Sequence, residues 1–177
     1  MKKLTTLFIL LSLALAGCES MTVSECQVAD WGRVGFNDAA SGVSESRLAA
    51  YTEDCGKAGV QPNIQAYRQG WDTGIVRYCT AANGWREGLQ GNRGKAEVCQ
   101  GQQGYEMFVR YLGTGLQVYH TNEHLRRNAA EARRLQKRLE ASTSDDEKKR
   151  LREELHDIDR EKYHLRAQLG WQQMQAP

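Results

Sequence analysis

The distribution of glycine separates this chain of 177 residues into two parts of different character. Fifteen of the 17 glycines lie between Gly32 and Gly115, whereas none lies between Leu116 and Leu169. Glycine destabilises a helix interior by about 1 kcal/mol relative to alanine, so a glycine-rich segment favours short elements and close backbone contacts. We therefore predict a compact domain over residues 18–118 and a separate charged helical tail over residues 119–170.

The amino terminus carries an apolar run, FILLSLALAG, that follows Lys2 and Lys3. The run is too short to cross a bilayer, which takes about 20 apolar residues, and it is typical of a signal peptide. Its end, the sequence LAGC at residues 15–18, resembles the lipobox of bacterial lipoproteins. This resemblance implies that residues 1–17 are removed and that Cys18 is acylated. An ordinary secretory signal beside an incidental cysteine is the alternative.

Acylation of Cys18 would attach the protein to a membrane surface. Each buried methylene contributes about 0.8 kcal/mol, and two or more acyl chains hold a protein stably. Where bacteria sort lipoproteins by the next residue, aspartate favours the inner membrane, and this chain has Glu19 instead. By resemblance we expect a lipoprotein of the outer membrane that faces the periplasm.

The remaining four cysteines all lie in the glycine-rich part and predict two disulfides, because exported proteins use even numbers of cysteines in this way. Three pairings are open. We favour Cys26 with Cys55 and Cys79 with Cys99, since each bridge then closes a loop of about 20 to 30 residues and contributes about 3 kcal/mol. A metal site made by the four thiolates is disfavoured, because the close-spaced cysteine pairs of zinc modules are absent.

Apolar spacing predicts short helices within residues 18–118. The first covers residues 24–42 with an N-cap at Ser24, the second covers residues 44–59, and the third covers residues 61–79. Gly70 and Gly74 lie inside the third helix, where close contact with another helix backbone would explain them. Residues 83–99 contain four glycines and are predicted to form a loop or short helical turns.

A set of spaced residues in this part follows one recognisable pattern: Asp30, Trp31, Gly35, Asp38, Gly42, Cys55, Tyr67, Gly70, Gly74, Tyr78, Cys79, Gly84, Gly88, Gly91 and Cys99. The pattern resembles a family of small bacterial lipoproteins catalogued as a domain of unknown function. The likeness covers roughly residues 18–118, and it departs from the family at Ala39, where a second glycine is expected. The resemblance implies export and disulfides but no reaction.

The tail is predicted to form two helices. Two runs have heptad spacing, and they consist of Leu125, Ala129, Ala132, Gln136 and Leu139, and of Leu151, Leu155, Ile158, Lys162, Leu165 and Leu169. Leu139 and Leu151 are twelve residues apart, whereas an unbroken heptad position recurs after seven or fourteen residues. Between them, Ser144 and Glu147 form a capping-box pattern that is typical of a new helix start. We favour an antiparallel hairpin, with Leu125 opposite Leu165, over a single bent helix. Residues 171–177 are expected to be disordered.

Several function classes are disfavoured. Removal of Lys2 and Lys3 from a chain with a formal net charge of +2 leaves a nearly neutral protein, so we predict no nucleic-acid partner. The glycine-rich part has no histidine for a nucleophile–histidine pair. Glu53 and Asp54 are adjacent and point to different sides of a helix, which is poor geometry for shared acid–base work. We predict no enzymatic activity and no cofactor.

Two binding sites remain as alternatives. Trp85 and Arg86, in the expected loop, have the chemistry to stack on and hydrogen-bond to wall glycan. His120, His124 and His164 would approach one another in the hairpin and bind a transition metal, although solvated histidines on a polar face are the plainer interpretation.

The sequence as a whole thus predicts an all-α lipoprotein with a small disulfide-stapled helical domain and a long helical hairpin or coiled-coil tail. We expect a non-enzymatic accessory or scaffold protein that uses residues 120–169 to bind an envelope protein or a second copy of itself. A peptidoglycan-binding or glycan-binding lipoprotein is the alternative.

Overall fold

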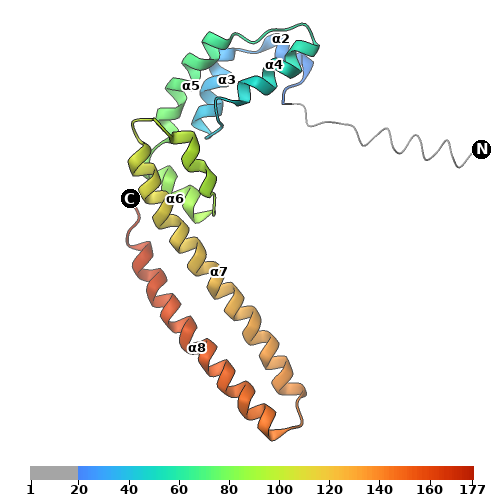
Figure 1. Ribbon diagram of the computed structural model, residues 1–177, viewed down its shortest axis with the longest axis vertical. Helices are drawn as coiled ribbons and strands as arrows, with labels where there is room; N and C mark the ends of the chain where they lie inside the picture. Colours follow the sequence, from blue (N-terminus) through green and yellow to red (C-terminus); the bar gives the residue numbers. More distant parts are fainter. Residues whose placement is uncertain (1–19) are drawn as a thin grey trace, which may run out of the picture. The chain divides into compact units, whose positions relative to one another are not determined.

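The computed structural model describes residues 20–177 (Figure 1). These residues form helices and connecting turns with no strand among them, so the predicted all-α fold is confirmed. Cys18 and the rest of the lipobox lie outside the described residues. Within residues 20–177, no helix has both the length and the apolar character that a membrane crossing requires.

The helices follow one another as α2 (Val23–Val28), α3 (Trp31–Ala40), α4 (Arg47–Lys57), α5 (Ile64–Tyr78), α6 (Ala81–Leu89), the 3₁₀ helix η2 (Arg93–Cys99), α7 (Tyr105–Ala141) and α8 (Asp145–Gln173). They belong to two compact units. Unit 1 ends at Ile75, and unit 2 runs from Val76 to Pro177.

Unit 1 begins with two helices where the sequence predicted one. Thr22, rather than Ser24, caps α2, because its hydroxyl accepts from the backbone of Glu25 and the Glu25 carboxylate accepts from the backbone of Thr22. The backbone turns to an extended conformation at Ala29. Asp30 then caps α3 by accepting a hydrogen bond from the Arg33 N–H at 3.1 Å. The second cap starts a new helix, and the expected helix over 24–42 is divided.

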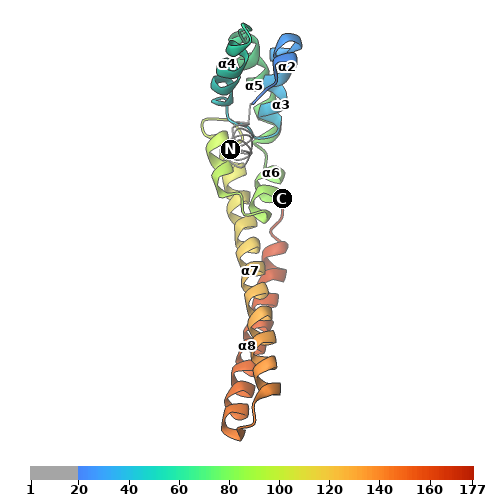
Figure 2. The same ribbon diagram turned by 90° about the vertical axis from the view of Figure 1, so that its right-hand side faces the viewer.

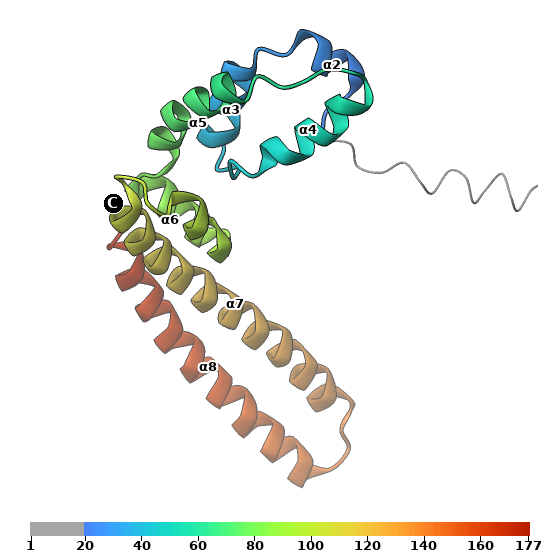
Figure 3. The same cartoon turned by 45° about the horizontal axis from the view of Figure 1, so that its top comes forward.

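In unit 1, helix α3 and the part of α5 up to Ile75 lie backbone to backbone (Figure 3). A Cβ atom added to Gly70 would lie 1.9 Å from the Gly32 carbonyl oxygen, and one added to Gly35 would lie 2.0 Å from the Tyr67 carbonyl oxygen. Gly74 meets α3 in the same way, 2.3 Å from the Phe36 oxygen. The close contact expected at Gly70 and Gly74 is therefore confirmed.

Each unit contains one disulfide. Cys26 of α2 is bonded to Cys55 of α4 in unit 1, and Cys79 is bonded to Cys99 of η2 in unit 2. The sequential pairing is confirmed. Each bridge therefore crosslinks segments of a single unit.

Unit 2 contains a second glycine-mediated helix pair. Cβ atoms on Gly84 and Gly88 of α6 would lie 2.2 Å and 2.4 Å from carbonyl oxygens of α7, and one on Gly115 of α7 would lie 2.5 Å from the Trp85 carbonyl oxygen. The prediction of a loop over 83–99 is therefore wrong for residues 83–89. The glycines there allow α7 to approach, and this packing supports the helix. Residues 93–99 do form a short 3₁₀ turn.

Helix α7 continues without interruption through residue 118, where the composition predicted a domain boundary. Gly115 lies inside this helix as a contact for α6. The hairpin and the segment from Val76 onward therefore form one unit, and the division of the chain falls earlier, after Ile75.

Helices α7 and α8 form an antiparallel hairpin, and two views show them side by side (Figures 1 and 2). The hairpin prediction is confirmed over the single bent helix. The disorder predicted for residues 171–177 is wrong over 171–173, because α8 extends to Gln173. Gln172 is only 4% exposed, and its side chain binds Thr121 at 3.0 Å.

Candidate functional site

Ser20, the first residue that the structure describes, is fixed to α4 of unit 1 through Asp54. One Asp54 carboxylate oxygen, Oδ2, accepts hydrogen bonds from the Ser20 backbone N–H at 2.7 Å and from the Ser20 hydroxyl at 2.6 Å. The other oxygen accepts from the Lys57 ammonium at 2.8 Å. The Lys57 and Ser20 hydrogen bonds hold the pKa of Asp54 well below its usual range. We call this arrangement the Ser20 clamp.

A groove of about 270 Å³ lies beside the Ser20 clamp. We call it the α2 groove, and its lining residues are Ser20, Met21, Glu25, Val28, Ala29, Asp30, Arg33 and Val34. Val28, at the end of α2, is 82% exposed. The groove therefore combines apolar side chains with the segment that directly follows the predicted acylation site.

The line of contact between α7 and α8, here called the hairpin seam, includes the buried residues Thr121, Asn128, Leu135, Leu151 and Gln172. The predicted spacing is correct for α8, where Leu151 is buried and Leu155, Ile158 and Leu165 are partly buried. On α7 the buried positions lie one residue earlier than predicted at two places, because Asn128 and Leu135 are buried whereas Gln136 is exposed.

Polar pairs occupy much of the hairpin seam. The Asn128 amide donates to a Glu161 carboxylate oxygen at 2.6 Å, and Thr121 donates to Gln172. A seam with polar pairs contributes less hydrophobic stabilisation than one made of leucine alone. These cross-helix contacts agree with the predicted alignment of Leu125 with Leu165.

The outer face of α8 carries a stripe of exposed apolar side chains. Tyr163 is 72% exposed, Trp171 is 63% exposed, and Met174, the C-cap residue that directly follows α8, is 77% exposed. Steps of four, four and three residues through Ala167 place them on one side of the helix, away from the leucines of the hairpin seam. The sequence analysis missed this stripe, although its helical spacing beside the leucine run was a usable signal.

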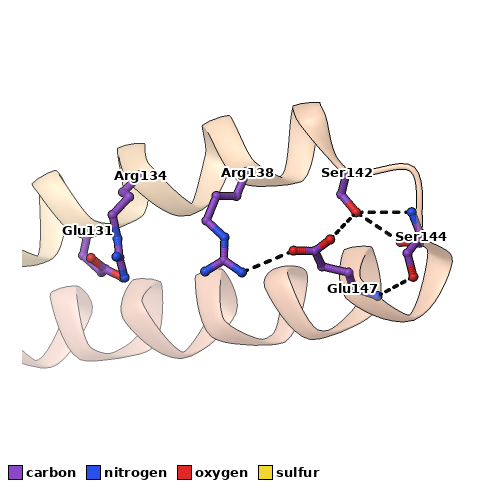
Figure 4. Close-up of polar contacts among 6 residues, drawn as sticks. All are labelled: Glu131, Arg134, Arg138, Ser142, Ser144 and Glu147. Carbon is purple, nitrogen blue, oxygen red and sulfur yellow. Dashed lines mark hydrogen bonds and ion pairs between the residues drawn. The ribbon is translucent and has the colours of Figure 1, made fainter.

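The hairpin tip is organised by Glu147 (Figure 4). Ser144 caps α8 by accepting from the Glu147 N–H at 3.4 Å. The Glu147 carboxylate accepts from the Ser142 hydroxyl at 2.8 Å and from the Arg138 guanidinium at 3.2 Å. The Ser142 and Arg138 hydrogen bonds lower the pKa of Glu147. The predicted capping box is thus half formed, because the carboxylate reaches across to α7 instead of returning to Ser144.

The histidines do not assemble into a site. His124 contacts a Glu161 carboxylate oxygen at 3.2 Å, while His120 and His164 lie edge-on to the neighbouring rings of Tyr119 and Tyr163. Among residues 20–177, no group of three histidine, cysteine or acidic side chains has an arrangement that could hold a metal ion. The suggested convergence of His120, His124 and His164 is therefore wrong.

The glycan-binding candidates lie on a helix instead of a loop. Trp85 and Arg86 belong to α6, where Trp85 is partly buried and Arg86 is exposed. The other tryptophans of the glycine-rich part, Trp31 and Trp71, are buried in unit 1. Among the tryptophans that the structure describes, Trp171 presents the largest exposed fraction.

The buried polar groups of unit 1 form a structural network. The Asp38 carboxylate accepts hydrogen bonds from the Tyr51 and Tyr67 hydroxyls at 3.3 Å and 2.8 Å. Burial first, and then the Asp38 carboxylate, raises the pKa of Tyr67 above its usual range. Both hydroxyls are therefore neutral at ordinary pH and act as hydrogen-bond donors that hold α3, α4 and α5 together.

Unit 2 has one comparable buried pair. The Tyr78 hydroxyl is buried without a hydrogen-bond partner, and burial followed by the Glu87 carboxylate raises its pKa. Glu87 accepts from the Asn92 amide at 2.7 Å. Tyr78 is 1% exposed and Glu87 is 8% exposed, and we assign the pair a role in packing.

Comparison with known proteins adds a family but no activity. Residues 30–117 match the model of a family described as a protein of unknown function, DUF2799. The chain belongs to this family, and the matched segment contains most of the glycine, tyrosine and cysteine pattern. No curated protein and no solved structure matched the chain.

Proposed function

We propose that this member of the DUF2799 family is a non-enzymatic, lipid-anchored protein of the cell envelope that presents α8 to a protein partner. The proposed anchor is Cys18, and the proposed location is the outer membrane, facing the periplasm. The observation that carries the partner proposal is the exposed stripe of Tyr163, Trp171 and Met174 on the outer face of α8.

The chemistry of this stripe supports protein recognition. Tryptophan and tyrosine are enriched among the residues that dominate binding energy at protein interfaces. Helices with apolar side chains at steps of three and four commonly dock into grooves of partner proteins. The amino-terminal half of the same outer face is charged instead, with Lys149, Glu153 and His156 exposed. The expected contact is therefore confined to the carboxyl-terminal half of α8.

The two disulfides support the proposed location. Bridges between Cys26 and Cys55 and between Cys79 and Cys99 are typical of proteins that fold in oxidising compartments such as the periplasm. An envelope location also suits the signal-like sequence that precedes Cys18.

Site-specific photo-crosslinking in cells tests this function. A photo-crosslinking amino acid at Trp171 is compared with one at Glu153, which lies 18 residues, or five helical turns, earlier on the same side of α8. We expect a discrete product from position 171 that is absent from position 153. A product of twice the chain mass would identify self-association, and another defined mass would identify a second protein.

Equal crosslinking at both positions, or none at either, would contradict the proposal. Trp171→Ala with a crosslinker at position 174 serves as the matched variant, because it removes the largest exposed ring without changing the hairpin seam. We expect this variant to lose most of the product.

The wall-glycan alternative depends on Trp85 and Arg86. Partial burial of Trp85 on α6 leaves less of its ring for stacking on a sugar than a loop position would. Sedimentation with purified wall sacculi tests this alternative directly. Retention of the wild-type chain and release of the Trp85→Ala variant would favour glycan binding over the protein-partner proposal.

A further inference from the structure

We infer that the α2 groove of unit 1 lies directly against the phospholipid leaflet, with Met21 and Val28 in contact with lipid. This inference rests on the proposed acylation of Cys18 and adds to it an orientation: unit 1 is held on the membrane surface and is not suspended on a long tether.

The chain between Cys18 and Ser20 is short. Two peptide units separate Cys18 from Ser20, so their Cα atoms lie at most about 7 Å apart. Ser20 is itself held by two hydrogen bonds to Asp54 on α4. An acyl chain on Cys18 that is inserted in a bilayer therefore brings the rim of the α2 groove to the headgroup region.

The surface of the α2 groove is partly apolar. Val28 is 82% exposed, and it lines the α2 groove together with Met21 and Val34. Met21 and Val34, unlike Val28, are partly buried. Apolar faces at a membrane surface bind at the headgroup and acyl-chain boundary, about 5–10 Å deep, without crossing the membrane. The acyl chain on Cys18 would already hold the protein at the membrane. The shallow contact at the α2 groove therefore does not need to bind the membrane by itself.

The charged groups around the α2 groove are mostly acidic. The titratable groups that line the groove or belong to the Ser20 clamp are Glu25, Asp30, Arg33, Asp54 and Lys57, and the exposed Glu53 outside the clamp lies 3.7 Å from Lys57. Four of these groups are acidic and two are basic, so anionic headgroups are not attracted to the surface. The lipid expected here is zwitterionic, and the contact depends on apolar side chains.

Spin-label accessibility on vesicles tests the inference. Acylated protein is bound to vesicles of phosphatidylethanolamine and phosphatidylcholine after labelling of Val28→Cys, with both native disulfides kept oxidised. Thr73→Cys on α5 is the matched exposed control. We expect vesicle binding to reduce collision with a water-soluble nickel reagent at least fivefold at position 28 and to leave position 73 unchanged.

The Ser20 clamp supplies the matched pair of variants. Asp54→Asn removes the charged acceptor of both Ser20 hydrogen bonds, and we expect it to restore about half of the nickel collisions at position 28. Glu53→Gln changes the neighbouring carboxylate, whose side chain is 77% exposed, and is expected to have no effect.

The outcomes separate this inference from its premise. Mass spectrometry that finds no acyl chain on Cys18 would overturn both the proposed anchor and the leaflet contact. An acylated, vesicle-bound protein whose position 28 stays open to nickel would overturn the leaflet contact alone. Protection of position 28 by acylation without vesicles would assign the groove to the protein's own acyl chain and would also overturn it.

Discussion

Unit 1 and the hairpin of unit 2 are stabilised in different ways. Unit 1 packs Trp31, Tyr51 and Tyr67 with ring centroids 6.1 Å apart in successive pairs, around a disulfide and a glycine-mediated helix contact. The hairpin beyond residue 118 has no disulfide in the described chain and relies on a seam with polar pairs such as Asn128 with Glu161. Regions with few buried apolar contacts open more readily, so the hairpin is the more adaptable part.

The two proposed functions, a membrane contact in unit 1 and a protein contact on α8, place different demands on the structure. A membrane contact at the α2 groove benefits from a rigid, crosslinked unit, because the groove must stay at a fixed position relative to the acyl anchor. A partner-binding helix benefits from a weaker seam that permits adjustment. Both units nevertheless use one device, a glycine placed against a carbonyl oxygen of a neighbouring helix.

The largest expected effect comes from filling this glycine contact. Gly70→Val should lower the free energy of unfolding of unit 1 by more than about 3 kcal/mol, because α3 and α5 must separate. Gly56→Ala on α4 is the control, since no atom outside its chain neighbours and its own helix backbone lies within 4 Å of the added Cβ, and it should raise stability by up to about 1 kcal/mol. Denaturant unfolding measures the free energy of unfolding of both variants. Equal effects would contradict the role of Gly70 as a contact between α3 and α5.

Removal of a disulfide should be next in size. Replacing Cys26 and Cys55 by serine is expected to cost about 3 kcal/mol on the chain-entropy model, and the Cys79 and Cys99 pair should cost a similar amount. Each pair of replacements should destabilise only the unit that contains the lost bridge. Hydrogen exchange followed by mass spectrometry tests this, and loss of protection spread evenly over both units would contradict the division at Ile75.

Truncation in the hairpin seam should follow. Leu135→Ala removes a side chain that is 1% exposed and should cost about 2 kcal/mol, the low end for buried leucine, because the seam is narrow enough to adjust. Gln136→Ala, at the next position, is expected to change stability by less than about 0.5 kcal/mol. A larger loss of stability in Gln136→Ala than in Leu135→Ala would support the buried position predicted from sequence and contradict the observed one.

The smallest effect is expected at the hairpin tip and depends on pH. Because the pKa of Glu147 is lowered in the folded hairpin, its contacts stabilise the tip above the ordinary glutamate value of 4.5 and are lost as pH falls below it. Amide exchange near Ser142 and Ser144, corrected for intrinsic rate, should therefore increase between pH 5 and pH 3 (about the range in which such carboxylates titrate). Glu147→Gln should abolish this increase.

Several features followed from local pattern. The leucine spacing of α8 and the break near Ser144 are each expressed over a few residues, so helix and hairpin were predictable. The even number of cysteines after Cys18 is a count, and it predicted two bridges without any knowledge of packing. The predictions failed where glycine was interpreted only through its helix propensity. Gly84 and Gly88 lie in a regular helix because a neighbouring helix, remote in sequence, occupies the space beside them.

The Ser20 clamp and the exposed stripe of α8 were also not predictable from local sequence. The acylation site at Cys18 is a local motif and stays a prediction from sequence. The Ser20 clamp joins residues 34 positions apart, and exposure of Tyr163 and Trp171 depends on which side of α8 the seam occupies. Neither is visible in a local window of sequence.

The amino-acid sequence alone determined that this chain is helical and that its tail folds back on itself, since propensity, spacing and capping act between near neighbours. The even number of cysteines after Cys18 predicted two bridges by count alone. Tertiary structure alone decided where the units divide, which glycines are contacts, and which apolar side chains stay exposed. Those outcomes depend on the approach of segments far apart in the chain, and only packing specifies that approach.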